Sequence, residues 1–162
     1  MVLITHHAER RKSTNTGRLV TLALQGAEVR LRGERDAAAR LPLPEGRRLL
    51  LFPHPEARAL TADDACGGPV VLLVPDGTWN QARRILRRDP DARDAEPVML
   101  PPGAPSRYGL RRAPREGTVS TLEAVARALA VLEVEGEAIE RGLMAIFDAF
   151  VDRSLRAAGR AR

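Results

Sequence analysis

The stretch Val70 to Arg88, VVLLVPDGTWNQARRILRR, decides the fold of this chain. Its first five residues, Val70 to Val74, are apolar and partly β-branched, which predicts a buried strand. The apolar run ends at Pro75, and a polar, arginine-rich pattern with helical spacing begins a few residues later. The stretch therefore predicts a strand that passes through one short turn directly into a helix.

The turn itself holds Asp76, Gly77, Thr78 and Trp79, the last being the single tryptophan of the chain. In open α/β sheets ligands bind at the carboxyl ends of strands. A helix start adds unpaired N–H groups and a positive dipole end. Two interpretations of the turn stay open: Asp76 or Thr78 caps the helix while Trp79 anchors the core, or the turn carries a ligand site.

Short apolar runs alternate with helical patterns along the rest of the chain. Strands are predicted at 1–5, 28–31, 47–52 and 97–100, a helical turn at 56–60, and helices at 19–24, 122–132 and 139–151. This alternation predicts an α/β fold with a mainly parallel sheet flanked by helices. The length of 162 residues predicts one domain spanning 1–162, with a basic, frayed tail at 156–162.

Composition narrows the class of protein. Hydrophobic residues make up 44% of the sequence but form no long apolar run, so no membrane span is expected. The N-terminus lacks the features of a signal peptide, so a cytoplasmic location is expected. A single cysteine, Cys66, excludes a disulfide framework and a cysteine-based zinc site within the chain. His6 and His7 are adjacent and His54 stands alone, so no metal site is expected.

The net charge is +5, and among 26 basic residues only Lys12 is a lysine. Arginine suits phosphate recognition and excess positive charge favours a polyanionic partner. Aromatic residues are only 3%, which argues against a stacking platform for single strands. Adjacent arginine pairs recur one helical turn apart, which makes either a nucleic-acid-binding stripe or an ordinary solvated face. They are Arg83, Arg84, Arg87 and Arg88.

Three further clusters have both a functional and a purely structural interpretation. Asn15-Thr16-Gly17-Arg18 is a polar turn before a helix and equally a cap. Leu51-Phe52-Pro53 ends a strand. Ser120 and Glu123 are spaced as a capping box before an apolar helix, which is compatible with ligand binding at the same place. The phosphate loop, the dinucleotide-binding glycine motif and the serine elbow are absent.

Four blocks occur in a fixed order: THHAERRKSTNTGRL, LLLFP, VPDGTWNQARRILRR and SRYGLRRAPREGTVSTLEA. From Ile4 to about Val131 the chain resembles the DTW-domain family. The resemblance implies a tRNA-uridine aminocarboxypropyltransferase, which uses S-adenosylmethionine and modifies N3 of a uridine in tRNA. It also implies a fold similar to the SPOUT class, with a trefoil knot at the C-terminal edge. It leaves open whether the protein is a monomer or a homodimer.

The resemblance suggests roles for individual residues. Asp76, as the acid of the turn, becomes the base or the group that orients the acceptor. Thr78 and the helix-start N–H groups would hold a uracil oxygen, and Trp79 would form a pocket wall or pack behind the pocket. The expected cofactor-binding residues are Leu51, Phe52, Pro53, Asp76, Gly77, Ser120, Thr121, Thr16, Gly17 and Arg18. The expected RNA-binding residues are Arg83, Arg84, Arg87, Arg88, Arg107 and Arg111. Arg18, Arg83 and Arg107 are candidates to pair with the cofactor carboxylate or a tRNA phosphate.

Two other functions fit the same residues. One is a SPOUT-like RNA methyltransferase with the same cofactor, and the other is a basic RNA-binding module without catalysis. Many members of the family carry an N-terminal cysteine-rich segment that resembles a zinc site, and the sequence starts just after its expected place. If that segment aids tRNA docking, a difference in affinity or target choice is expected here.

Overall fold

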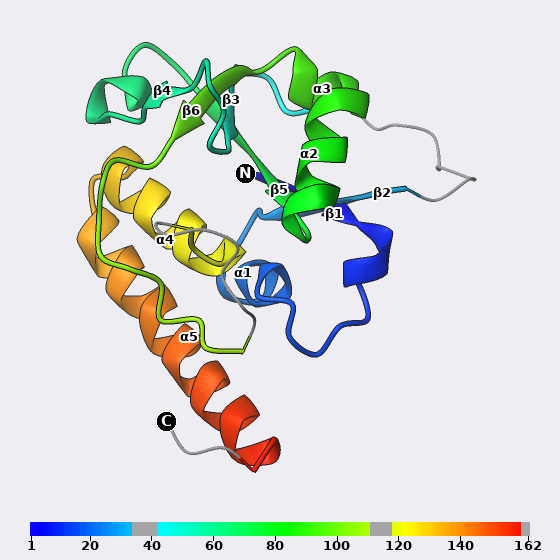
Figure 1. Cartoon of the computed structure of the whole chain (residues 1–162). Helices are drawn as coiled ribbons and strands as arrows, with labels where there is room; N and C mark the ends of the chain where they lie inside the picture. Colours follow the sequence, from blue (N-terminus) through cyan, green and yellow to red (C-terminus); the bar gives the residue numbers. More distant parts are fainter. Residues whose placement is uncertain (34–41, 111–117, 160–162) are drawn as a thin grey trace.

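The described residues form one parallel sheet with the strand order β2-β1-β5-β3-β6-β4 (Figure 1). A computed structural model describes residues 1–33, 42–110 and 118–159. The strands are β1 (Val2–His6), β2 (Glu28–Arg32), β3 (Arg47–Leu51), β4 (Arg58–Ala59), β5 (Val70–Asp76) and β6 (Glu96–Met99). All five strand pairings are parallel. The predicted α/β class with a parallel sheet is confirmed.

Helices cover both faces of the sheet. The helices are α1 (Gly17–Ala23), α2 (Trp79–Arg88), α3 (Pro90–Arg93), α4 (Thr121–Leu132) and α5 (Gly136–Ala157). Two short 3-10 turns, η1 (His7–Glu9) and η2 (Ala62–Ala65), add to them. Helices α1, α4 and α5 lie on one side of the sheet, and α2 and α3 lie on the other (Figure 1).

The central strands contain apolar runs, Leu49–Leu51 in β3 and Val71–Val74 in β5, because both of their faces are buried there. Successive side chains of a strand point to opposite faces. In β3, Leu49 packs with α4 and α5 while Leu50 packs with α2 and α3. In β5, Leu72 and Leu73 divide between the two faces in the same way. The continuous runs that predicted buried strands thus supply two separate cores.

β5 is longer than the sequence predicted, because it continues past Val74 through Pro75 and Asp76. Pro75 lies opposite Ile4 of β1, and Asp76 lies opposite Thr5. The pairing of β5 with β3 ends earlier, at Leu73. Proline has no N–H to give to a ladder, and here it stands beyond the end of the β3 ladder. Asp76 is therefore the last residue of a central strand.

Two other predictions need correction. The helical turn predicted at 56–60 is wrong, since Arg58–Ala59 forms the edge strand β4 and the N–H of Leu60 donates to the carbonyl of Met99 at 2.9 Å. The tail was predicted to fray from Arg156, but α5 continues to Ala157. The end of that tail, 160–162, lies outside the described residues.

An ion-pair network at the amino ends of β3, β4 and β6 generates a pH prediction. Asp64 is buried, accepts a hydrogen bond from Arg58 Nη1 at 2.8 Å, and lies 3.2 Å from Arg47 Nη1. Hydrogen bonding to Arg58 is the main cause that lowers the pKa of Asp64. The pKa of Glu96 is lowered by hydrogen bonds to Arg47 and then Arg58. A lowered folded-state pKa stabilises the fold above the unfolded value and loses that contribution in acid.

We therefore expect the melting temperature to fall as the pH drops below about 4. Asp64→Asn should lower the melting temperature at pH 7 and make it less sensitive to acid. Calorimetric scans between pH 7 and pH 2.5 measure both effects. Asp63→Asn, an exposed neighbour, is the matched control. Parallel pH curves for wild type and Asp64→Asn would contradict this assignment.

Candidate active site at the carboxyl edge of the sheet

Two cavities adjoin where β3, β5 and β6 end. The first has a volume of about 390 Å³ and a lining with many polar residues, including Asn15, Asp76 and Tyr108. The second has a volume of about 490 Å³ and a mainly apolar lining that begins with Leu51, Phe52 and Pro53. We call them the polar cavity and the apolar cavity. They share Gly77, Trp79 and the segment 118–121 as a common wall.

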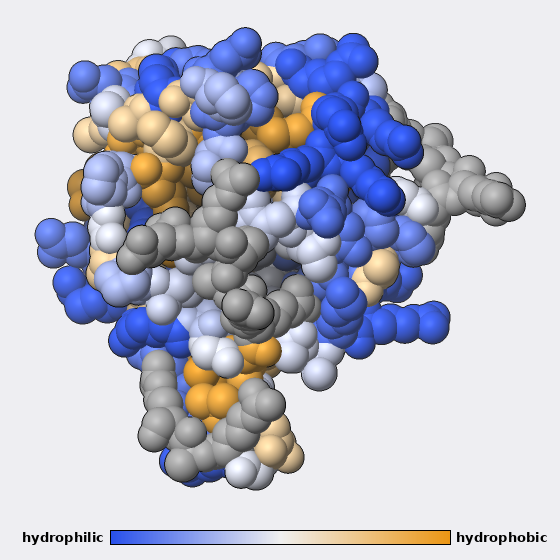
Figure 2. Space-filling model, viewed as in Figure 1, coloured by the Kyte–Doolittle hydropathy of each residue, from blue (hydrophilic) through white to orange (hydrophobic). Residues whose placement is uncertain are grey.

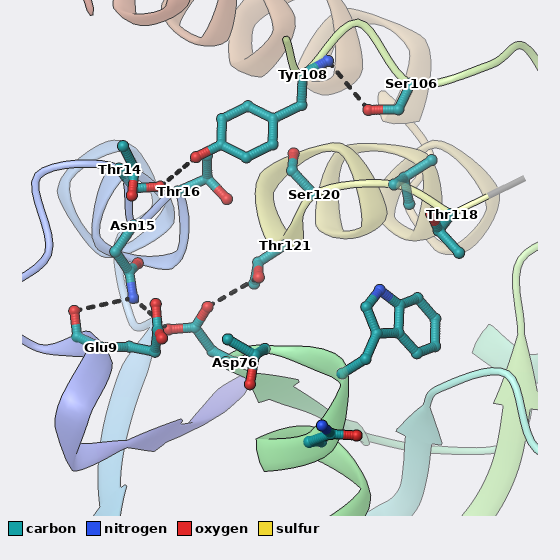
Figure 3. Close-up of a pocket in the computed structure, with 15 residues that line it drawn as sticks. Glu9, Thr14, Asn15, Thr16, Asp76, Ser106, Tyr108, Thr118, Ser120 and Thr121 are labelled. Atoms are coloured by element: carbon teal, nitrogen blue, oxygen red, sulfur yellow. Dashed lines mark hydrogen bonds between the residues drawn. The ribbon is translucent and has the colours of Figure 1, made fainter. Parts of the chain in front are cut away.

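The carboxylate of Asp76 lies at the polar cavity and is only 4% exposed. Its Oδ2 accepts a hydrogen bond from Asn15 Nδ2 at 2.9 Å, and its Oδ1 accepts one from Thr121 Oγ1 at 2.8 Å (Figure 3). These donors come from the loop before α1 and from the first turn of α4. With both oxygens held, the carboxylate has one orientation.

The Asn15–Arg18 segment supports this carboxylate more than it lines a cavity. A Cβ atom on Gly17 would lie 2.6 Å from the carboxyl carbon of Asp76, so the two residues pack without room for a side chain. Asn15 is fixed in turn, since its Oδ1 accepts from the N–H of Arg18 at 2.9 Å. Thr16 lines the polar cavity, but Gly17 and Arg18 are not among the described residues that line either one.

The hydrogen bond from Asn15 to Asp76 is the contact of this site that the sequence did not predict. The sequence placed Asn15 in a polar cluster with either a functional or a capping role, and its amide oxygen does accept a hydrogen bond one turn into the helix. The same side chain also donates to Asp76, which lies 61 positions away. Its place in the first of the four blocks was the available indication, but no local pattern specifies so distant a partner.

The start of α2 confirms a helix cap at the central turn. Thr78 caps the helix: its Oγ1 accepts from the N–H of Gln81 at 3.4 Å, and Gln81 Oε1 accepts from the N–H of Thr78 at 2.6 Å. The interpretation of Asp76 as the cap is wrong. The backbone N–H groups of Trp79 and Asn80 have no acceptor among the described residues, and both residues line the polar cavity.

The predicted capping box at the start of α4 is confirmed, and the same turn belongs to both cavities. Ser120 Oγ accepts from the N–H of Glu123 at 3.4 Å, and the N–H of Ser120 donates to Glu123 Oε2 at 2.8 Å. Glu123 is fully buried and also accepts from Ser106 Oγ at 2.7 Å and the N–H of Arg107 at 2.8 Å. Capping and cavity lining therefore coexist at Ser120 and Thr121.

Trp79 separates the two cavities. Its indole lies 5.2 Å, between ring centroids, from the tilted ring of Phe52. Phe52 continues from the end of β3 and lines the apolar cavity with Leu51 and Pro53. The structure thus brings the predicted residues of the second and third blocks into one wall.

The charges around the polar cavity are negative. Glu9 and Asp76 line it, and no cationic side chain is among its described lining residues. Glu9 is buried and pairs with Lys12 Nζ at 2.5 Å. Burial and the neighbouring His7 lower the pKa of His6, which ends the strand beside Asp76. The carboxylates of Glu9 and Asp76 in this lining suit a ligand group that carries positive charge.

The predicted RNA-binding arginines divide into three groups. Arg83, Arg84, Arg87 and Arg88 are exposed on α2, form no ion pair with a described carboxylate, and lie in the region where Figure 2 shows strongly hydrophilic side chains. Arg107 instead pairs with Asp148 of α5 at 3.0 Å. Arg111 lies outside the described residues.

The described residues also bear on metal binding and membrane insertion. They contain no group of three or more histidine, cysteine or acidic side chains placed to hold a metal ion. No helix in this part of the chain combines the length and the apolar character needed to cross a membrane.

Fold and site together define a parallel α/β protein with a two-chambered site at the carboxyl edge of its sheet. Residues 1–155 match the DTW domain. The chain belongs to the DTW-domain family, as the four sequence blocks predicted.

Curated relatives extend the comparison. The chain is 35% identical over 144 residues to tRNA-uridine aminocarboxypropyltransferase 2 of Drosophila melanogaster, covering 85% of this chain and 57% of that protein. It is 29% identical over 188 residues to tRNA-uridine aminocarboxypropyltransferase A of Arabidopsis thaliana, covering 93% and 69% respectively. The chain thus spans little more than half the length of the first of these relatives.

A solved structure shares the fold. The SAM-dependent rRNA:acp-transferase Tsr3 from Vulcanisaeta distributa superposes with a TM-score of 0.52 at 20% sequence identity, covering 98% of this chain and 83% of that one. At this identity the similarity concerns the fold.

The contact between Gly17 and Asp76 generates a prediction with a built-in control. Gly17→Ala places a Cβ atom 2.6 Å from the carboxyl carbon, so α1 or Asp76 must shift. We expect it to destabilise the protein by about 1–3 kcal/mol, as overpacking does. Gly142→Ala on α5, where nothing lies within 4 Å, should stabilise it by about 0.5–1 kcal/mol. Urea unfolding measures both, and equal effects of the two changes would refute the close contact.

Proposed function

We propose that this protein transfers the 3-amino-3-carboxypropyl group of S-adenosylmethionine to N3 of a uridine in tRNA. The observation that carries the proposal is the carboxylate of Asp76, held by Asn15 and Thr121 at a polar cavity that shares a wall with an apolar one. Two such chambers suit the reactants, since the adenine of the cofactor can pack on an apolar wall while its aminocarboxypropyl group and the uracil base are polar. The names of the curated relatives support the same activity.

The apolar cavity suits the adenosine half of the cofactor. Leu51, Phe52 and Pro53 line it, and its volume of about 490 Å³ lies within the usual range of small-molecule sites. Gly77, Ser120 and Thr121 belong to both linings, so they would meet the cofactor where it passes between the chambers. The aminocarboxypropyl group would then enter the polar cavity beside Thr16, where the acidic lining suits its ammonium group.

The residues of the polar cavity fit the acceptor chemistry. S-adenosylmethionine supplies a carbon activated by the adjacent sulfonium, and N3 of uridine must lose its proton to bond to that carbon. Asp76 accepts the N3 proton or orients the base through it. The hydroxyl of Thr78 and the N–H groups of Trp79 and Asn80 can donate to a uracil oxygen that gains negative charge. Trp79 keeps the two reactants at the shared wall.

The arginines of α2 suit the phosphates of tRNA. Arg83, Arg84, Arg87 and Arg88 continue the helix that starts at the polar cavity. Their exposure and their lack of described acidic partners leave their charge available to a polyanion. Arg18, beside the Asn15 loop, adds another exposed positive charge. Arg107 would have to break its ion pair with Asp148 in order to bind a phosphate.

We also propose the finer fold of the SPOUT class, with a trefoil knot at the C-terminal edge. In support, the walls of both cavities come from segments that follow β5 and β6 and from the start of α4. A single domain over 1–162 and a cytoplasmic location stay predictions from the sequence.

The reaction is tested by its products and by Asp76→Asn. Purified protein incubated with S-adenosylmethionine and unmodified tRNA should release methylthioadenosine. Release of adenosylhomocysteine would instead identify a methyltransferase. Release of neither product would identify a binding module without catalysis. Asp76→Asn keeps an oxygen for Asn15, and Thr121 can accept from the new amide, so the fold and cofactor affinity should persist. Transfer should fall by about 10²–10⁴-fold, as loss of a general base does.

Single-turnover assays with saturating cofactor measure that loss. Melting temperature and calorimetric titration of cofactor serve as controls on the same sample. Near-wild-type turnover of a folded Asp76→Asn variant would remove Asp76 from the reaction.

The arginine assignment is tested by salt dependence. If each arginine of α2 contacts one phosphate, a single Arg→Gln change at Arg83, Arg84, Arg87 or Arg88 should lower the log–log salt slope of tRNA binding by about one unit. Arg153→Gln and Arg156→Gln, exposed on the distant end of α5, are matched controls (Figure 1). Slopes that stay the same in all α2 variants would make this helix an ordinary solvated face.

A further inference from the structure

Arg127 is the single charged residue among the described residues that line the apolar cavity. None of the arginines that the sequence suggested for the cofactor, Arg18, Arg83 and Arg107, lines either cavity in the described part of the chain. Arg127 belongs to α4 and is half-buried. A cation in a mainly apolar lining calls for a structural explanation, because removing a charge from water is costly.

The guanidinium of Arg127 holds the segment that follows β6. Its Nη2 donates to the carbonyl of Ala104 at 2.7 Å. A Cβ atom on Gly103 would lie 3.3 Å from Nη1, so the guanidinium rests directly on the backbone there. Pro101, Pro102 and Gly103 form part of the wall of the apolar cavity. Arg127 therefore fastens one wall of this cavity to α4.

Glu123, one helical turn earlier, does the same for the next part of the segment. Its carboxylate accepts from Ser106 Oγ and from the N–H of Arg107, and Ser106 lines the polar cavity. Figure 1 shows the segment running beside α4 and α5 after it leaves β6. Two charged side chains of α4, four residues apart, thus attach consecutive parts of this irregular segment to the helix. Arg127 attaches the part at the apolar cavity, and Glu123 attaches the part at the polar cavity.

We propose that Arg127 is a positioning residue for the adenosine half of S-adenosylmethionine. It holds the 101–104 wall in the shape that binds the cofactor, and it acts on affinity and not on the transfer step. The inference rests on the proposed function, since it takes the apolar cavity as the cofactor site. It predicts that the loss of Arg127 weakens every ligand that contains the adenosine group, whether or not the ligand carries the aminocarboxypropyl group.

The test compares two ligands and several variants. Calorimetric titration of Arg127→Met with methylthioadenosine and with S-adenosylmethionine should show both affinities reduced about tenfold or more. Tenfold corresponds to about 1.4 kcal/mol, the lower end of what a hydrogen bond to a charged group contributes. KM for the cofactor should rise in parallel, while kcat at saturating cofactor stays within about twofold. Arg127→Lys should recover part of the affinity, because lysine can still donate to the Ala104 carbonyl.

The control is Arg141→Met on α5, which removes an exposed arginine whose ion-pair partner among the described residues is Glu137 of the same helix. If Arg127→Met does not fold, Arg127→Gln answers the same question with a milder change. A folded variant with wild-type affinity for methylthioadenosine would overturn the inference, as would a loss confined to kcat. Wild-type protein that binds neither ligand would instead contradict the proposed function itself, and the inference with it.

Discussion

The hydrogen bonds that hold the Asp76 carboxylate are the constraint on which the site depends. They join the end of a central strand to the loop before α1 and to the first turn of α4. Removing a carboxylate from water is costly unless its oxygens find donors. At 4% exposure Asp76 meets this condition through Asn15 and Thr121. The same contacts that satisfy the charge therefore fix where three distant segments meet.

The first turn of α4 extends this organisation outward. The N–H of Leu122 donates to Thr16 Oγ1 at 3.4 Å, next to the hydrogen bond from Thr121 to Asp76. Ser120 and Glu123 satisfy each other at the helix start, and Glu123 also holds the chain at Ser106 and Arg107. Irregular segments have few backbone bonds of their own, so side chains of one rigid helix supply their order. Both cavities inherit their shape from this helix.

Local patterns predicted the parts of the structure that local forces determine. The apolar run at Val70–Val74, the Ser120–Glu123 capping box and the helical stripes each follow from spacing along the chain. The pairing of Asn15 with Asp76 does not follow from spacing along the chain, because it depends on the order of the strands in the sheet. The extension of β5 through Pro75 was missed for the same reason: proline is tolerated there only because β3 stops pairing first. The two-residue strand β4 is too short for any periodicity.

Ion pairs neutralise some of the arginines of this chain, whereas those of α2 keep their charge. At the amino ends of β3, β4 and β6, Arg47 and Arg58 are matched by Asp64 and Glu96. At the β2 edge, Arg32 is matched by Asp89. These acids neutralise arginines that the sheet needs, whereas in the described part of the chain no acid is paired with the arginines of α2. Part of the net charge of +5 therefore stays unpaired among the described residues on α2, the helix that begins beside Asp76.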